Sequence, residues 1–142
     1  MPRLASFALV LALVGCANSE GPAEARTGCD DGGLTGWSGE LVTRQHGVTG
    51  TVEFVDSCTL DVQGFGFDGA GLDVRFVVAD NPAFDDYSVL SDDLRRSGGY
   101  DGEALSFPLT MAVNPATAEH VSIWCVPAGV SFGDAVLVPP AS

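Results

Sequence analysis

The sequence predicts an all-β domain, an antiparallel β-sandwich or barrel-like fold with at most one short helical turn. In segments 51–55, 59–63 and 72–78, apolar side chains alternate with polar or charged ones. This period of two is typical of strands that have one face in the core and the other in solvent. Asp, Ser and Gly separate the segments, as in "VDSC" and "FDGAG", and these residues favour turns. Short strands at such spacing are typical of sandwiches and barrels.

The alternation also assigns inward faces. These faces are formed by Val52 and Phe54, by Leu60 and Val62, and by Leu72, Val74 and Phe76. Further strands are expected at 104–109, 121–126 and 130–138. A helical turn is expected in "SDDLRR", residues 91–96, because Ser91 is a good N-cap and the next two aspartates suit the positive end of a helix dipole. Gly98 favours an early end to this turn.

The N-terminus predicts export and lipidation. Residues 1–15 are expected to be a lipoprotein signal peptide, because Arg3 precedes an apolar run too short to span a bilayer. The segment "LVGC", which ends at Cys16, resembles the bacterial lipobox, in which the cysteine is lipidated. An ordinary signal peptide that happens to contain a cysteine is the alternative. Cys16 is therefore the predicted lipidation site.

The rest of the chain divides by composition. Residues 16–36 are expected to form a flexible lipidated tether, residues 37–138 one β domain and residues 139–142 a tail. The expected contact with a membrane is the lipid anchor, since no later segment is long and apolar enough to cross a bilayer. Ala17 and Asn18 follow the lipid site without an aspartate, which by resemblance to Gram-negative sorting signals favours the outer membrane of a bacterial cell envelope, on its periplasmic or surface face.

The charge of the chain excludes two classes of partner. The sequence has nineteen acids, six arginines and no lysine, a formal net charge of −13. Nucleic acid and anionic headgroups repel such a chain, so neither is expected as a partner. A solvated surface is the simple interpretation of this charge, and a cation or a basic partner is the alternative.

Three segments resemble one known family. Residues 46–78 ("HGVTGTVEFVDSCTLDVQGFGFDGAGLDVRFVV"), 100–109 ("YDGEALSFPL") and 121–137 ("VSIWCVPAGVSFGDAVL") are similar to motifs of the DM-thirteen domain. The most specific parts of this resemblance are the residue pairs Trp124-Cys125 and Phe132-Gly133. The resemblance implies an extracytoplasmic β-sandwich in an electron-transfer system. It also implies that Cys125 acts as a redox thiol or holds a prosthetic group such as non-covalent haem.

The residues themselves leave three roles open for Cys125. The alternation in 121–126 places Val121, Ile123 and Cys125 on one face, so the sulfur is expected in the core, where thiols react poorly. It is then a structural disulfide partner in an oxidising envelope, a redox or cofactor-binding sulfur, or an inert buried thiol. Cys58 is the second redox candidate.

The disulfide pairing has two candidate solutions. With Cys16 lipidated, three cysteines remain, and each single pairing leaves one of them out. A Cys58–Cys125 bridge is the first choice, because both residues are expected in rigid strands of one small sandwich. A bridge from Cys29, which would staple the tether to the domain, is the second.

Cofactor signals are weak. The chain has no C-x-x-C, no C-x-x-C-H and no His/Cys cluster with zinc spacing, so no dithiol, covalent haem or metal site is predicted. For the haem that the resemblance implies, Cys125 and His46 are the candidate cofactor-binding residues, with His120 and Met111 as further axial partners. A strand-end histidine bonded to backbone is the alternative for His46.

Two functions are consistent with these observations. The first is a membrane-tethered envelope lipoprotein whose DM-thirteen-like domain serves extracytoplasmic electron transfer or thiol redox through Cys125, with a redox or other envelope protein as partner. The second is a non-enzymatic binding or scaffold lipoprotein with purely structural cysteines. No nucleophile elbow and no Ser/His/acid order is present, so no catalytic residue is predicted. An electron-transfer or binding module is favoured over a stand-alone enzyme.

Overall fold

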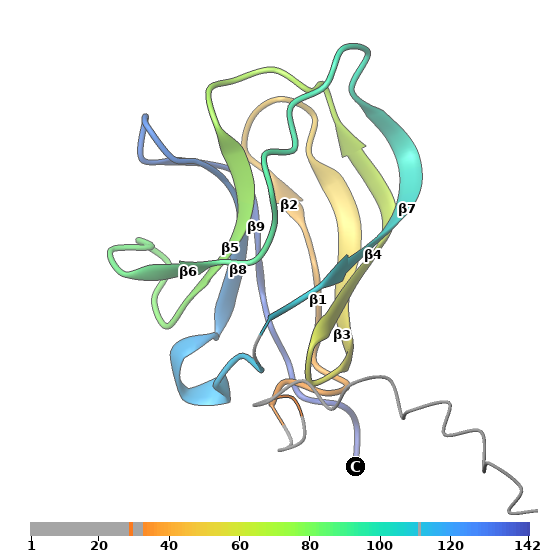
Figure 1. Cartoon of the computed structure of the whole chain (residues 1–142), viewed down its shortest axis with the longest axis vertical. Coiled ribbons are helices and arrows are strands. Elements are labelled where there is room, and N and C mark those ends of the chain that lie inside the picture. Colours follow the sequence, from red (N-terminus) through yellow and green to blue (C-terminus); the bar gives the residue numbers. More distant parts are fainter. Residues whose placement is uncertain (1–28, 30–32, 111) are drawn as a thin grey trace, which may run out of the picture.

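The computed structural model describes residue 29 and residues 33–110 and 112–142. Two antiparallel sheets face each other across the core (Figure 1), one with the strand order β1-β3-β4-β7 and the other with the order β2-β9-β8-β5-β6. Among these residues the only helical element is the 3₁₀ turn η1 (Pro115–Thr117), and no helix is long and apolar enough to span a membrane. The predicted all-β sandwich is confirmed, and the sheets do not close into a barrel.

The strands of each sheet come from distant parts of the chain. The four-stranded sheet consists of β1 (Ser38–Glu40), β3 (Thr49–Asp56), β4 (Thr59–Phe67) and β7 (Tyr100–Pro108). The five-stranded sheet consists of β2 (Val42–Thr43), β5 (Val74–Ala79), β6 (Tyr87–Val89), β8 (His120–Cys125) and β9 (Val130–Val136). Because β1 and β2 are adjacent in the chain but lie in different sheets, the chain crosses between the sheets at Leu41. Just before this crossing, β1 passes close to the backbone of β9. Only a glycine fits there, since a Cβ on Gly39 would lie 2.6 Å from the carbonyl oxygen of Val136.

The core confirms the inward faces of the first two predicted strands. Val52, Phe54, Leu60 and Val62 are fully buried. The inward set of β4 continues with Phe65 rather than residue 64, because Gly64 has a φ of 64° and the pairing with β7 shifts register there. Such a bulge inserts one residue and so changes which later residues face the core.

The third predicted strand begins later than its alternation indicates. Val74 and Phe76 are fully buried as predicted, but Leu72 lies outside β5 and is 62% exposed. Asp73 has a φ of 46°, a left-handed conformation that interrupts an extended strand. The predicted inward position of Leu72 is therefore wrong.

The helical turn predicted at 91–96 is also wrong. Ser91 accepts a hydrogen bond from the backbone N–H of Phe76 (2.9 Å), and the backbone N–H of Leu94 donates to the carbonyl of Val74 (2.7 Å). This segment therefore continues along β5 as an irregular edge instead of coiling on itself. Ser and Asp side chains can cap either a helix or a neighbouring strand, and here they bind the strand.

A second apolar cluster covers the outer face of the five-stranded sheet. The loop 80–86 brings Phe84 against Trp124, with ring centroids 5.3 Å apart, and Tyr87 lies at 5.8 Å from the same indole. Trp124 thus faces away from the core, as the alternation with Cys125 requires. Its buried Nε1 has no hydrogen-bond partner among the described residues.

The aromatic core allows a direct test of the sandwich. Phe65 is fully buried against Phe76 of the opposite sheet (centroids 5.5 Å apart), whereas Phe107 on the edge strand β7 is only partly buried. Phe65→Ala should lower the free energy of unfolding by about 3–5 kcal/mol, because it removes a large buried ring and leaves a cavity. Phe107→Ala makes the same chemical change at the edge and should cost clearly less. Urea unfolding measures both, and equal losses would contradict this placement of the core.

Candidate functional site

Cys125 is the free cysteine among the described residues. It ends β8, pairs with Val74 of β5 and Val130 of β9, and is 3% exposed. It lies in the main core with Val121 and Ile123, which confirms the inward direction that the alternation predicts. The thiol donates a hydrogen bond to the carbonyl oxygen of Leu72, with Sγ and O 3.2 Å apart.

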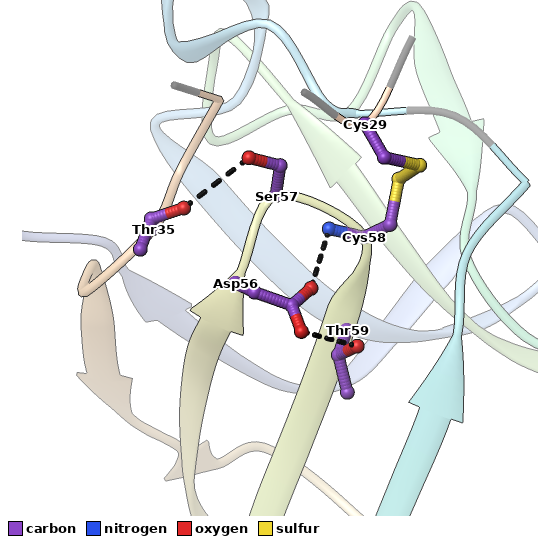
Figure 2. The surroundings of a disulfide bond; sticks show 6 residues. All are labelled: Cys29, Thr35, Asp56, Ser57, Cys58 and Thr59. Carbon is purple, nitrogen blue, oxygen red and sulfur yellow. Dashed lines mark hydrogen bonds between the residues drawn. A yellow bond between two sulfur atoms is a disulfide. The ribbon is translucent and has the colours of Figure 1, made fainter. Parts of the chain in front are cut away.

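The predicted Cys58–Cys125 disulfide is wrong. Cys58 is bonded to Cys29, with their Cα atoms 5.5 Å apart (Figure 2), so the second choice, a bridge from Cys29, is correct. Cys58 lies in the β3–β4 turn at one end of the sandwich, whereas Cys125 lies at the far end of β8 (Figure 1). Both sulfurs are buried, but alternation along a strand does not reveal at which end of the sandwich a residue lies.

Side chains of the β3–β4 turn hold the disulfide in place (Figure 2). The carboxylate of Asp56 accepts hydrogen bonds from the backbone N–H of Cys58 (2.8 Å) and from the hydroxyl of Thr59 (3.0 Å). The hydroxyls of Thr35 and Ser57 are 3.3 Å apart and link the preceding segment to the same turn. The bridge therefore attaches the N-terminal side of the domain firmly to the end opposite Cys125.

Residues 68–73, here called the strap, connect β4 to β5 at one end of the sandwich (Figure 1, green, at the upper end). Gly69, Gly71 and Asp73 all have positive φ values, of 79°, 117° and 46°. The carbonyl of Leu72 accepts from the Cys125 thiol, and that of Asp73 accepts from the backbone N–H of Val126 (3.0 Å). The sequence identified "FDGAG" only as a turn, and nothing in its composition indicated that it would cover the cysteine.

His46 lies at the same end of the sandwich and ties down the start of the strap. Its Nδ1 is hydrogen-bonded to Oδ2 of Asp68 (2.8 Å), and its carbonyl accepts from the backbone N–H of Asp68 (3.0 Å). Burial alone would raise the pKa of Asp68, but hydrogen bonds from the Ala70 backbone and the His46 ring outweigh it and lower that pKa. The ring of His46 packs against Phe132, with centroids 4.1 Å apart. The predicted alternative for His46, a ring bonded to backbone, is replaced by a ring bonded to a carboxylate.

The arginines of the described residues all take part in ion pairs. The pairs are Arg44 with Asp134 (2.9 Å), Arg75 with Asp73 (2.6 Å), Arg95 with Asp93 (2.6 Å) and Arg96 with Glu103. The hydrogen bond and charge of Asp93 are the main causes that raise the pKa of Arg95, and Cys125 adds a smaller electrostatic contribution. Arg95 also lines the same surface hollow as Gly69 and Gly71.

The described residues do not fit a haem held by Cys125 and His46. The sulfur is covered by the strap, and the ring of Phe132 lies both against His46 and under Gly71, where a Cβ would approach that ring to 2.9 Å. Two surface hollows, one between β6 and β7 and one beside the strap, are lined by neither candidate ligand. No group of three or more His, Cys, Asp or Glu side chains with metal-binding geometry occurs in this part of the chain.

The other sequence candidates are not gathered around Cys125. His120 begins β8, five residues before Cys125, which corresponds to about 16 Å along a strand. Cys16 and Met111 lie outside the described residues. The structure thus brings together Cys125, the strap and Arg95, of which the sequence alone identified the cysteine.

Comparison with known families agrees with this architecture. Residues 40–137 match the family model described as electron transfer DM13. The chain belongs to the DM13 family. The DM13 domain covers β2 to β9 and includes Cys58 and Cys125, and it indicates an electron-transfer or redox module. Comparisons with curated proteins and with solved structures gave no significant match.

The disulfide assignment predicts which thiol is free. When the protein is unfolded without reductant and treated with iodoacetamide, peptide mass spectrometry should find Cys125 alkylated and Cys29 unmodified. Replacing both Cys29 and Cys58 by alanine should lower the free energy of unfolding by about 3–4 kcal/mol, because the bridge closes a long loop in the unfolded chain. Alkylation of Cys29 in the wild-type protein would contradict the assignment.

Asp93 makes stability near the site depend on pH. The side-chain hydrogen bond from Arg95, opposed by burial and helped by backbone N–H groups of Arg95 and Val74, lowers the pKa of Asp93 to about 2. Unfolded aspartate titrates near pH 3.9, so this carboxylate stabilises the fold fully above about pH 4 and loses its effect as the pH falls towards 2. Asp93→Asn should therefore make stability less dependent on pH between 4 and 2.

Urea unfolding across that pH range measures the effect. Asp86→Asn, which removes a negative charge from the exposed part of the loop 80–86, is the matched control. An Asp93→Asn variant with the same pH dependence as the wild-type protein would contradict the role of this carboxylate.

Proposed function

We propose that the protein is a lipid-anchored envelope protein whose DM13 domain performs thiol redox chemistry through Cys125 with a protein partner. The observation that carries this proposal is that Cys125 is a free thiol within the family's domain. The other two cysteines of the described residues, Cys29 and Cys58, already form a disulfide. The presence of both a reduced thiol and an oxidised pair in one small domain is consistent with a sulfur kept for exchange rather than for bracing the fold.

The chemistry would be thiol–disulfide exchange. The thiolate of Cys125 attacks one sulfur of a partner's disulfide, a new S–S bond forms, the partner's S–S bond breaks, and its second sulfur leaves as a thiolate that takes up the proton lost from Cys125. An incoming thiolate then attacks the partner's sulfur in this bridge, forms a disulfide with it and releases Cys125. The described residues place no second free cysteine beside Cys125, so partner thiols must complete the cycle.

The lipid anchor and the disulfide together suggest how the domain is presented. Cys29 follows the proposed lipid site Cys16 in the chain, and its bridge fixes the N-terminal side of the domain at the end of the sandwich opposite Cys125. The end with Cys125 would then face away from the anchor, where an envelope partner can approach it. The signal peptide, the "LVGC" motif and the outer-membrane sorting residues support the envelope location.

A binding or scaffold function is the second candidate. The observation that favours it is the shielding of Cys125, which is 3% exposed and hydrogen-bonded to Leu72. A sulfur in such a site can serve the core as a small apolar side chain. Under this function the Cys29–Cys58 bridge braces the fold and Cys125 has no reaction to perform.

Mixed disulfides distinguish the two functions. The mature, lipid-anchored protein should form a reversible mixed disulfide with glutathione at Cys125 when oxidised and reduced glutathione are varied, and cells should contain slower-migrating species on non-reducing gels. Both signals should be absent in Cys125→Ser. A thiol that stays reduced at every glutathione ratio, together with normal cellular function of Cys125→Ser, would overturn the redox function and leave the scaffold function.

A further inference from the structure

We infer that the strap, residues 68–73, is a gate that controls access to Cys125 and opens locally while the sandwich stays folded. The inference rests on the proposed function, because it names how the reacting sulfur of that function is regulated. It identifies the end of the sandwich with the strap as the surface where a partner engages the domain.

The cover over the sulfur is thin. The strap touches the sulfur through the carbonyl of Leu72, while the Leu72 side chain points to solvent and is 62% exposed. The buried thiol is therefore in direct contact with the backbone of a surface segment. The exposed apolar side chain of the residue that binds the thiol gives a partner a group to contact when it displaces the strap.

The other sides of the sulfur are much harder to open. Cys125 pairs with Val74 on one neighbouring strand and with Val130 on the other, at the end of both antiparallel ladders. Exposure of the sulfur through the sheet would break many ladder hydrogen bonds. Displacement of the strap breaks the bond from the thiol to Leu72, the bond from Val126 to Asp73 and the tie between His46 and Asp68. Local opening follows the route with the fewest broken contacts.

The strap has two glycines that can act as hinges and polar contacts that hold it at both ends. Gly69 and Gly71 occupy positive-φ conformations that glycine adopts without steric cost, and they suit a segment that changes its backbone angles. At one end Asp68 is bonded to His46, and at the other end the side chain of Asp73 is paired with Arg75 (2.6 Å). These polar ties return the strap to its closed position without burying it in the core.

In its closed position the strap packs most closely against the core at Gly71. A Cβ at this residue would lie 2.8 Å from a methyl group of Val74 and 2.9 Å from the ring of Phe132. Both neighbours are buried core residues that cannot move aside easily. Gly71→Ala should therefore disfavour the closed position and populate the open one. Gly64→Ala is a matched control, because Gly64 also has a positive φ but a Cβ there would meet no atom within 4 Å.

The test is alkylation of Cys125 by iodoacetamide in the folded mature protein, measured by mass spectrometry at fixed pH over a series of low urea concentrations. Through a local gate, the alkylation rate should depend only weakly on urea, because little surface is exposed on opening. Gly71→Ala should raise the rate about tenfold or more, since overpacking of this size shifts an equilibrium by that order. Gly64→Ala should stay within about twofold of the wild-type rate.

Global stability is measured for each variant by urea unfolding. Two results would overturn the gate. One is a wild-type alkylation rate with the same urea dependence as global unfolding. The other is a rise in the alkylation rate of Gly71→Ala that is fully accounted for by its loss of global stability. Asp68→Asn provides a second variant, because it weakens the tie to His46 without adding bulk to the core, and it should raise the alkylation rate as well. Unchanged alkylation in both strap variants would also contradict the gate.

The gate and the proposed function can fail separately. Alkylation uses a small reagent and needs no partner, so it reports on the strap alone. A strap that opens locally in a protein that forms no mixed disulfides would leave the gate in place and remove the redox function. Mixed disulfides at Cys125 without faster alkylation of Gly71→Ala would do the reverse.

Discussion

The packing of two apolar sheet faces against each other determines where every other group in this domain lies. Phe65 from the four-stranded sheet meets Phe76 from the five-stranded sheet at 5.5 Å between ring centroids, and both rings are fully buried. Because side chains alternate along a strand, the burial of these faces fixes the direction of each neighbouring side chain as well. Cys125 lies inside and Trp124 outside for this reason alone.

The two ends of the sandwich consequently have different chemistry. One end holds the oxidised pair Cys29–Cys58, tightened by Asp56 and joined to the N-terminal segment. The other end holds the reduced Cys125 under a strap that is polar, rich in glycine and exposed. A domain attached at one end is free to present the other, so the disulfide contributes to the proposed function although it takes no part in the exchange.

The sequence predicts which face of a strand each side chain lies on, but not where a strand ends or at which end of the sandwich a residue lies. Alternation correctly predicts that Cys125 points inward, yet it cannot show that Cys58 lies at the opposite end of the sandwich. The predicted Cys58–Cys125 disulfide is wrong for this reason. Leu72 continues the apolar alternation of β5, but the positive φ of Asp73 stops the strand and turns Leu72 out to solvent. Ser91 offers a helix cap, and the unpaired backbone of β5 captures it instead. In each case a tertiary contact outweighs a local preference.

Shielding and reactivity of the sulfur are compatible when the shield is a local equilibrium. The rate at which a buried thiol reacts is its intrinsic rate multiplied by the fraction of time for which it is open, and that fraction depends on the contacts that must break. At Cys125 these contacts are the bonds to the strap from the thiol, from Val126 and from His46, and none of them belongs to a ladder between the named strands. A partner that gains contacts with Leu72 in the open form shifts the same equilibrium towards exposure. The sulfur would then be inert towards most other molecules and reactive towards the protein that lifts the strap.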